Sequence, residues 1–355
     1  MRHNNCELNP HMYFILQVIL LPIIGYLFHR LINARGYKQV FRFRVPDLPK
    51  ASARIPLPPD TEVIELFVYP VKSCRGISVK SAKLLATGLD LDRQWMLIDS
   101  RTRKTLTIRE VSELTLIDTA IDVEFDTLTL SIRGEEPCIT IPAHPTQAWL
   151  SANTVMVSTE IWKTKTDAWE YSSSLTSPLT ALLNREVALL YKGPSPRVLG
   201  RNGAPSRLGR VASTCFADEF PLLSASASSL DAVNEKLRER GVNEISIERF
   251  RPNLVVKGVQ PWEEDCWKTV IIDNTLTMDV ITRCGRCTVP NVDPQTGRRD
   301  NKEPFDTLMR FRRVDEGLKF KPCFGMMCVP REEGVIGVGM PFRVLSCTAE
   351  HRYLK

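Results

Sequence analysis

Short hydrophobic segments with alternating or β-branched residues recur along most of the chain. Residues 62–70 (EVIELFVYP) alternate hydrophobic and polar positions, which is typical of a strand with one buried face. Similar segments predict further strands at residues 93–100 and 105–110 around the turn SRTRK, 114–125 and 127–134 around Asp126, 153–159, 246–256, 269–281 with a bend at Asp273 and Asn274, and 334–345. Many short strands favour a β-barrel-like architecture over a doubly wound sheet.

Helical periodicity is limited to two segments. Residues 228–241 place three apolar side chains on one face, and we expect Ser228 to cap the first turn and Gly241 to end the helix. Residues 177–185 predict a shorter helix with Pro178 at its first position. The predicted fold class is therefore mainly β with some α.

A change in composition divides the strand-rich part of the chain. Residues 193–213 are rich in glycine, proline and arginine and have no apolar period, so we interpret them as an interdomain linker or a mobile loop. They separate a first predicted domain, residues 61–192, from a second one, residues 214–347.

The N-terminal part of the chain has the features of a membrane anchor. After a short tail, residues 1–11, the uncharged segment 12–28 is close to the minimum of about 17 residues that a bilayer requires. Residues 29–60 are first basic and then proline-rich, and we interpret them as a tether. By the positive-inside rule, the basic excess after the anchor leaves the large body in the cytosol. A cleaved signal peptide is the alternative, but the segment LFHRLINARG is a poor cleavage site.

Charge and cysteine usage exclude two classes of protein. The formal net charge of +6 comes from residues 1–54, which hold eight basic and two acidic side chains, so residues 55–355 carry 39 of each. A neutral body argues against nucleic-acid binding. Ten scattered cysteines in a cytosolic chain of this size are expected to be reduced thiols rather than a disulfide framework.

Two cysteines, Cys284 and Cys287, form a C-x-x-C motif next to Arg283 and Arg286. A closed zinc site would need a second pair of ligands, which the spacing of the other cysteines and of the five histidines does not provide. A thioredoxin-like couple would open a helix, but here the pair follows a strand and prolines come after it. A single reactive thiolate supported by the nearby arginines remains, as does a pair of buried structural cysteines.

A second group of residues indicates an anion site. Lys72 and Ser73 come just after a predicted strand, and Arg93 begins another. Arg251 and Asn253 follow further along the chain, and serines 224, 226, 228 and 229 lie around the start of the helix 228–241. Hydroxyl groups, cations and free helix N–H groups are what a phosphate or an anionic cofactor requires. Each residue taken singly also has an ordinary structural explanation.

Four motifs taken together resemble a known family. In order along the chain they are YPVKSCRG (69–76), GLDLDRQWMLID (88–99), FRPNLVV (250–256) and CGRCTVPNVDPQTG (284–297). Their order and spacing resemble the MOSC family, and most closely its membrane-anchored mitochondrial amidoxime-reducing components. The resemblance covers about residues 61–346.

The resemblance implies two β-barrel-like units, an N-terminal MOSC domain and a MOSC domain proper, that hold a molybdenum cofactor (Mo-molybdopterin). It makes Cys287 the metal ligand and a catalytic residue, and it leaves Cys284 beside it. It also makes Asp218, in FADEFP, a candidate proton donor. The residues expected to hold the pterin and its phosphate are Lys72, Ser73, Arg93, Ser226, Ser228, Arg251, Asn253 and Arg286. Gly285 stands where relatives often carry a hydroxyl side chain.

The activity implied by the resemblance is the reduction of small N-hydroxylated substrates, such as amidoximes and hydroxylamines, to amidines and amines. The sequence has no dinucleotide-binding motif, so electrons must come from partners. The resemblance implies cytochrome b5 and NADH-cytochrome b5 reductase at the mitochondrial outer membrane, although the endoplasmic reticulum membrane is also compatible with the anchor. Two alternatives stay open: a sulfur carrier or transferase like the C-terminal part of molybdenum cofactor sulfurase, and a non-catalytic anchored binding module.

Overall fold

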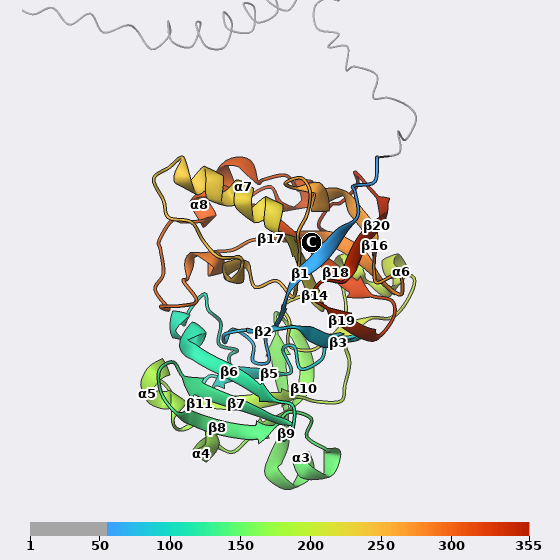
Figure 1. Cartoon of the computed structure of the whole chain (residues 1–355). Coiled ribbons are helices and arrows are strands. Elements are labelled where there is room, and N and C mark those ends of the chain that lie inside the picture. The colour runs from blue at the N-terminus through green and yellow to red at the C-terminus, as the bar shows by residue number, and fades with distance from the viewer. Residues whose placement is uncertain (1–54, 355) are drawn as a thin grey trace, which may run out of the picture. The chain divides into compact units, whose positions relative to one another are not determined.

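Seven strands close into a barrel in the structure, a computed structural model that describes residues 55–354 (Figure 1). The strand order is β15-β14-β18-β17-β16-β20-β1, and the barrel closes because β1 pairs with both β20 and β15, while β2 extends the sheet beyond β1. These strands are β1 (Thr61–Val68), β2 (Ile77–Val79), β14 (Leu222–Ser226), β15 (Leu254–Val256), β16 (Trp267–Ile272), β17 (Leu276–Gly285), β18 (Cys323–Pro330) and β20 (Pro341–Cys347).

The alternation seen in the sequence explains how these strands build the barrel core. Along β17, buried and partly exposed residues alternate over all ten positions, as a strand with one core-facing side requires. Asp273, Asn274 and Thr275 connect β16 to β17, and Asp273 and Asn274 have positive φ angles of 48° and 56°. Asparagine and aspartate tolerate this conformation, so the predicted bend is confirmed as a tight hairpin.

Smaller sheets lie below the barrel in the view of Figure 1. They comprise a four-stranded sheet, β5-β11-β10-β9, two three-stranded sheets, β6-β7-β8 and β19-β3-β4, and the short pair β12-β13. Their bounds are β3 (Ser81–Leu85), β4 (Gly88–Leu89), β5 (Trp95–Asp99), β6 (Ile117–Asp122), β7 (Thr127–Ile132), β8 (Pro137–Pro142), β9 (Thr154–Ile161), β10 (Thr164–Tyr171), β11 (Val187–Lys192), β12 (Arg197–Val198), β13 (Ser213–Thr214) and β19 (Gly334–Gly337).

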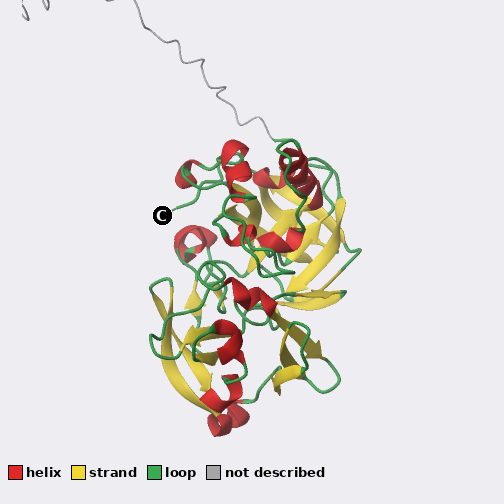
Figure 2. Ribbon diagram, turned by 90° about the vertical axis from the view of Figure 1, so that its left-hand side faces the viewer, coloured by secondary structure: helices red, strands yellow, loops and turns green. Residues whose placement is uncertain are grey.

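Helices are short and peripheral, as Figure 2 shows. The longest, α7, buries Val233 and Leu237 against the outside of the barrel in a cluster with Phe250 and Leu308. The α-helices are α3 (Gln147–Asn153), α4 (Ser173–Thr176), α5 (Leu179–Leu183), α6 (Pro205–Leu208), α7 (Ala227–Arg238) and α8 (Phe305–Phe311). The 3-10 helices are η2 (Ser112–Leu116), η3 (Arg201–Gly203), η4 (Ile247–Phe250), η5 (Glu263–Cys266), η6 (Val289–Asn291) and η7 (Glu316–Leu318).

Most predicted elements are present, and the mainly β fold class is confirmed. The pair around Asp126 forms β6 and β7, and the helix predicted at 228–241 is α7. Ser228 does not cap this helix, because the helix begins one residue earlier and the Ser228 hydroxyl donates to the carbonyl of Gln260. The prediction of a continuous strand over 246–256 is wrong, because its first half forms η4.

The predicted hairpin over 93–110 is only partly formed. Its first strand is β5, but residues 105–110 contribute a single bridge, between Ile98 and Thr105. Beyond that bridge the chain leaves the sheet and forms a turn, in which the N–H of Val111 bonds the carbonyl of Thr107. This departure carries Arg109 away from the sheet and into the cavity described below.

Strand β1 joins the two halves of the described chain. Although it begins the first predicted domain, it pairs with β15 and β20 of the second, and residues 55–354 form one compact unit. The predicted anchor at 12–28 and most of the tether lie outside the described residues. No helix within residues 55–354 is long and apolar enough to cross a bilayer.

Replacement of Trp267 by alanine tests the barrel core. Trp267 is completely buried, and its ring centroid lies 4.9 Å from that of Phe342 on the neighbouring strand β20. Loss of this side chain leaves a large cavity, so we expect a decrease of about 3–5 kcal/mol in the free energy of unfolding, measured by urea denaturation. Val335→Ala on β19, where the side chain is 57% exposed, is the matched control and should change it by about 0.5 kcal/mol or less. Equal losses in the two variants would contradict this assignment of the core.

Candidate functional site

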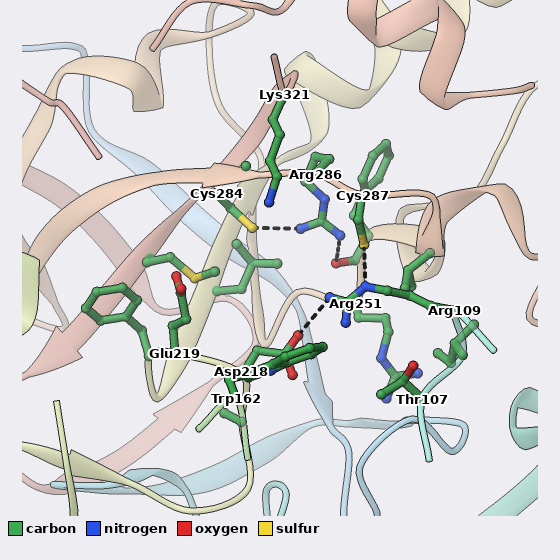
Figure 3. Close-up of a pocket in the computed structure, with 18 of the residues that line it drawn as sticks. Thr107, Arg109, Trp162, Asp218, Glu219, Arg251, Cys284, Arg286, Cys287 and Lys321 are labelled. Atoms are coloured by element: carbon green, nitrogen blue, oxygen red, sulfur yellow. Dashed lines mark hydrogen bonds and ion pairs between the residues drawn. The ribbon is translucent and has the colours of Figure 1, made fainter. Parts of the chain in front are cut away.

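A cavity of about 830 Å³ gathers most of the predicted site residues (Figure 3). It lies where the end of β17 meets loops from both halves of the chain. Eight cationic side chains line it, but only two carboxylates do. This excess of positive charge is typical of a site for an anionic ligand. The predicted residues that line it are Lys72, Ser73, Arg93, Asp218, Arg251, Asn253, Arg286 and Cys287.

The two cysteines of the C-x-x-C motif have different environments. Cys284 is buried, and its sulfur accepts a hydrogen bond of 3.0 Å from the Arg286 guanidinium. Burial raises the pKa of the Cys284 thiol, and the arginine opposes this shift only in part. Cys287, two residues after the end of β17, is partly exposed to the cavity. Both cysteines line the cavity, and Cys287 is the more exposed of the two.

A cation that was not predicted from the sequence, Arg109, contacts Cys287. Its Nε donates to the Cys287 sulfur at 3.2 Å, and its guanidinium lies 4.7 Å from the ring centroid of Trp162 (Figure 3). Arg283, which was expected to support the thiolate, is turned toward Asp265 and donates to the carbonyl of His351. The sequence around Arg109 gives no warning of this role, because it has the pattern of an ordinary strand.

Asp218 forms ion pairs with two cations. It contacts the Lys72 ammonium, and one of its oxygens lies 3.2 Å from the Arg109 guanidinium. The carboxylate lines the cavity, and its side chain is 42% exposed. Burial acts to raise the pKa of Asp218, but Lys72 and then Arg109 outweigh it and hold that pKa well below its usual range. An ionised carboxylate does not donate a proton near neutral pH, so the predicted proton-donor role of Asp218 is not supported.

Two arginines of the wall, Arg93 and Arg251, pack against the buried Tyr69. The guanidinium groups of Arg93 and Arg251 each lie 4.3 Å from the ring centroid of Tyr69. Burial lowers the pKa of Arg251 to about 10, which leaves it a cation at neutral pH. Ser73, Arg93 and Arg251 all have positive φ angles, of 71°, 50° and 59°. Residues other than glycine rarely adopt this conformation, and it is enriched at functional sites.

Beneath these arginines lies a buried polar network centred on Asp92. Its carboxylate accepts hydrogen bonds from Arg93 at 2.5 Å, from the backbone N–H of Tyr69 at 2.8 Å and from Asn253 at 2.9 Å. The Asn253 amide also donates to the carbonyl of Phe67 and accepts from the N–H of Leu223. Asn253 therefore ties β1 to β14 and fixes Arg93 through Asp92, and its donors are already used within the protein.

The structure does not bring the two predicted serines to the cavity. Their hydroxyl oxygens lie 2.7 Å apart, with Ser226 fully buried and Ser228 bonded to the carbonyl of Gln260. Leu223 lines the cavity near the opposite end of β14, and Ser226 lies three positions further along the strand, about 10 Å away. The prediction that Ser226 and Ser228 contact a ligand in this cavity is therefore not supported.

The residues present fit an anionic cofactor with a soft metal. Among the described residues, no carboxylate lies within ion-pair distance of Arg251, Arg286 or Lys321, although all three line the cavity. The buried Nε of Arg286 also lacks a hydrogen-bond partner. Arg286 is buried and Arg251 is half-buried, and an unpaired cation away from water is costly, so a ligand that supplies negative charge here would stabilise the site. The Cys287 thiolate suits a soft metal.

Comparison with known proteins gives the family. Residues 60–186 match the model of the MOSC N-terminal beta barrel domain, and residues 212–343 match that of the MOSC domain. The chain is 31% identical over 293 residues to the mitochondrial amidoxime-reducing component 1 of Mus musculus, with 80% of this chain and 82% of that protein covered. The chain belongs to the MOSC family.

Two further relatives within the MOSC family show its range. The mitochondrial amidoxime reducing component 2 of Bos taurus is 30% identical over 288 residues and is covered over 82% of its length. The molybdenum cofactor sulfurase of Arabidopsis thaliana is 32% identical over 290 residues, but the chain spans only 34% of that protein. The relatives thus include both a reducing component and a sulfurase, so family membership alone does not choose between the two activities.

The ion pairs of Asp218 predict a specific pH dependence of stability. A carboxyl whose pKa is lower in the folded than in the unfolded protein stabilises the fold above its unfolded value, near 3.9, and this contribution is lost as the pH falls further. We expect Asp218→Asn to lower the free energy of unfolding by a constant amount between pH 8 and 5, and the difference from wild type to shrink below about pH 4. Urea denaturation at pH 7, 5 and 3.5 measures this, with Glu136→Gln at an exposed position as control. A difference that stays the same at pH 3.5 would contradict the lowered pKa.

Proposed function

We propose that this protein is a molybdenum-cofactor-dependent reductase of N-hydroxylated substrates. The observation that carries the proposal is the position of the Cys287 thiol, which faces a cavity with far more cations than carboxylates and accepts a hydrogen bond from Arg109. The similarity to mitochondrial amidoxime-reducing components over about 80% of the chain supports the reductive activity.

The chain's own residues have distinct roles in this proposal. Cys287 would hold the metal, and Lys72, Ser73, Arg93 and Arg251 would hold the anionic pterin. When bound, the cofactor would supply two-electron redox chemistry at a metal next to Cys287. Asn253 and Asp92 orient Arg93, and Asp218 orients Lys72 and Arg109.

The proposed reaction removes one oxygen from nitrogen. An amidoxime takes up two electrons and two protons, its N–O bond breaks, and an amidine and water are released. Trp162, which is 51% exposed, offers a flat aromatic surface beside Arg109 on which the substrate's own ring can stack.

The electrons would come from cytochrome b5 and its NADH-dependent reductase. Residues 12–28, which lie outside the described part of the chain, would anchor the protein in the mitochondrial outer membrane.

A sulfur-transfer role is the second candidate. The 32% identity to a molybdenum cofactor sulfurase over 290 residues favours it, and a partly exposed thiol such as Cys287 could carry a persulfide. A reductase and a sulfur carrier both handle the cofactor, so cofactor content alone does not separate them. Turnover of an N-hydroxylated substrate does.

Metal content tests the proposed ligand. The full chain, produced in a host that makes the eukaryotic cofactor, should hold close to one molybdenum per protein by plasma mass spectrometry. Cys287→Ala should lose most of this metal, whereas Cys284→Ala should keep it, because the Cys284 sulfur is buried and already accepts a hydrogen bond from Arg286. Equal losses in the two variants would overturn the single-ligand assignment. If wild type holds neither molybdenum nor pterin, the non-catalytic binding module becomes the better explanation.

Turnover tests the reaction. With NADH, cytochrome b5 reductase and cytochrome b5, the purified protein should convert benzamidoxime to benzamidine, measured by chromatography. Arg109→Gln should lower kcat by about tenfold or more, because it removes the only hydrogen bond to the Cys287 sulfur that the described residues provide, and Arg109→Lys should recover part of the loss. A protein that holds molybdenum but does not turn over benzamidoxime would favour the sulfur carrier.

A further inference from the structure

The segment that follows β20, residues 348–354, returns to the cavity and places Tyr353 in its wall. Two contacts hold the backbone of Tyr353 in place. The N–H of Tyr353 donates to the buried carboxylate of Asp315 at 3.0 Å. Its carbonyl is packed so closely on Gly317 that a Cβ added to that glycine would lie 1.9 Å from the oxygen. A residue held in this way forms a fixed part of the wall.

The predicted linker 193–213 holds the same segment from the other side. The side chain of Asn202 donates to the carbonyl of Arg352 at 2.9 Å and accepts from the N–H of Leu354 at 2.8 Å. The preceding residue, Arg201, lies with its guanidinium 5.5 Å from the centroid of the Tyr353 ring. Rather than acting as a spacer, this part of the chain is built into the cavity wall.

The side chains of Arg201, Glu219 and Tyr353 form a connected rim. The Tyr353 hydroxyl donates to the Glu219 carboxylate at 2.5 Å, and Arg201 forms an ion pair with the same carboxylate. Burial and then the hydrogen bond to Glu219 raise the pKa of Tyr353, so its hydroxyl stays protonated and keeps donating. All three residues line the same cavity as Cys287 and Arg109.

The rim differs from the rest of the cavity in its relation to the family. Lys72, Arg93, Arg251 and Cys287 all lie within the stretches that match the two MOSC models, residues 60–186 and 212–343. Arg201 lies between those stretches and Tyr353 lies after them, so two of the three rim residues come from parts of this chain that the family models do not match.

We propose that the rim formed by Arg201, Glu219 and Tyr353 determines substrate size, and that it excludes N-hydroxylated compounds whose ring system extends too far from the reacting nitrogen. This inference rests on the proposed reductase activity for its substrate class. A wall with a fixed backbone and a hydrogen-bonded side chain discriminates by steric exclusion, because a ligand that displaces Tyr353 also breaks its bond to Glu219.

The test compares benzamidoxime with 4-phenylbenzamidoxime, which is longer by one ring. In Tyr353→Ala the ratio of kcat/KM for the longer over the shorter substrate should rise on the order of tenfold, mainly through KM. Tyr353→Phe keeps the ring and should give a smaller change. Arg352→Ala is the matched control, because its side chain is 61% exposed and does not line the cavity. Arg201→Ala, at a position 48% exposed, opens the rim and leaves the backbone hydrogen bonds of Tyr353 and Leu354 in place.

A second readout separates this inference from the proposed activity. The two corresponding amidines, as products that need no turnover, are titrated into each full-length variant by calorimetry. One outcome is that wild type reduces neither amidoxime while the ratio of amidine affinities still changes in Tyr353→Ala. This outcome would contradict the proposed reductase activity and support size selection by the rim. The proposed role of the rim is contradicted if neither the kcat/KM ratio nor the ratio of amidine affinities changes in Tyr353→Ala and Arg201→Ala. In that case molybdenum content and melting temperature must also be unchanged. A change of the same size in Arg352→Ala would also contradict the proposed role.

Discussion

The structure depends on keeping positive charge inside a β-rich protein. Eight cations line one cavity and only two carboxylates offset them there, although an unpaired charge away from water is costly. Ion pairs offset part of this charge. Asp218 pairs with Lys72 and Arg109, and the buried Asp92 pairs with Arg93. Arg251 and Arg286 have no such partner among the described residues, and an anionic ligand would complete the balance.

The fold holds this charge in place by bringing distant parts of the chain together. Asn253 links β1 to β14, and the Arg109 turn reaches Cys287, which is 178 residues away in sequence. Three of the ligand-facing residues adopt left-handed backbone conformations, which persist only where surrounding contacts fix them. The barrel and the smaller sheets together supply these contacts, so the cavity is a property of the whole described unit rather than of one motif.

The sequence predicted the parts that depend on local patterns. The β6-β7 pair, the turn at Asp273 and the helix α7 follow from alternation, turn chemistry and periodicity, and they are present. The positions of Lys72, Arg251 and Cys287 at the cavity agree with their motifs. Arg109 and Tyr353 could not be found in this way, because long-range contacts alone bring them to the cavity. For Ser226 and Ser228 the local pattern was misleading. They lie at the start of a helix, which suggested an anion site, but their hydroxyl groups bond to each other and to the carbonyl of Gln260.

The closure of the barrel by β1 has a consequence for biosynthesis. Thr61 pairs with Phe342, about 280 residues later, and Leu66 pairs with Leu254. At about 5–20 residues per second, roughly 15 to 60 s pass between the synthesis of these partners. During that time β1 exposes unpaired edges and apolar side chains, which is the condition under which nascent chains aggregate. The barrel can close only after β20 has left the ribosome, so its completion is a late event, and nascent-chain chaperones have a long interval in which to bind β1.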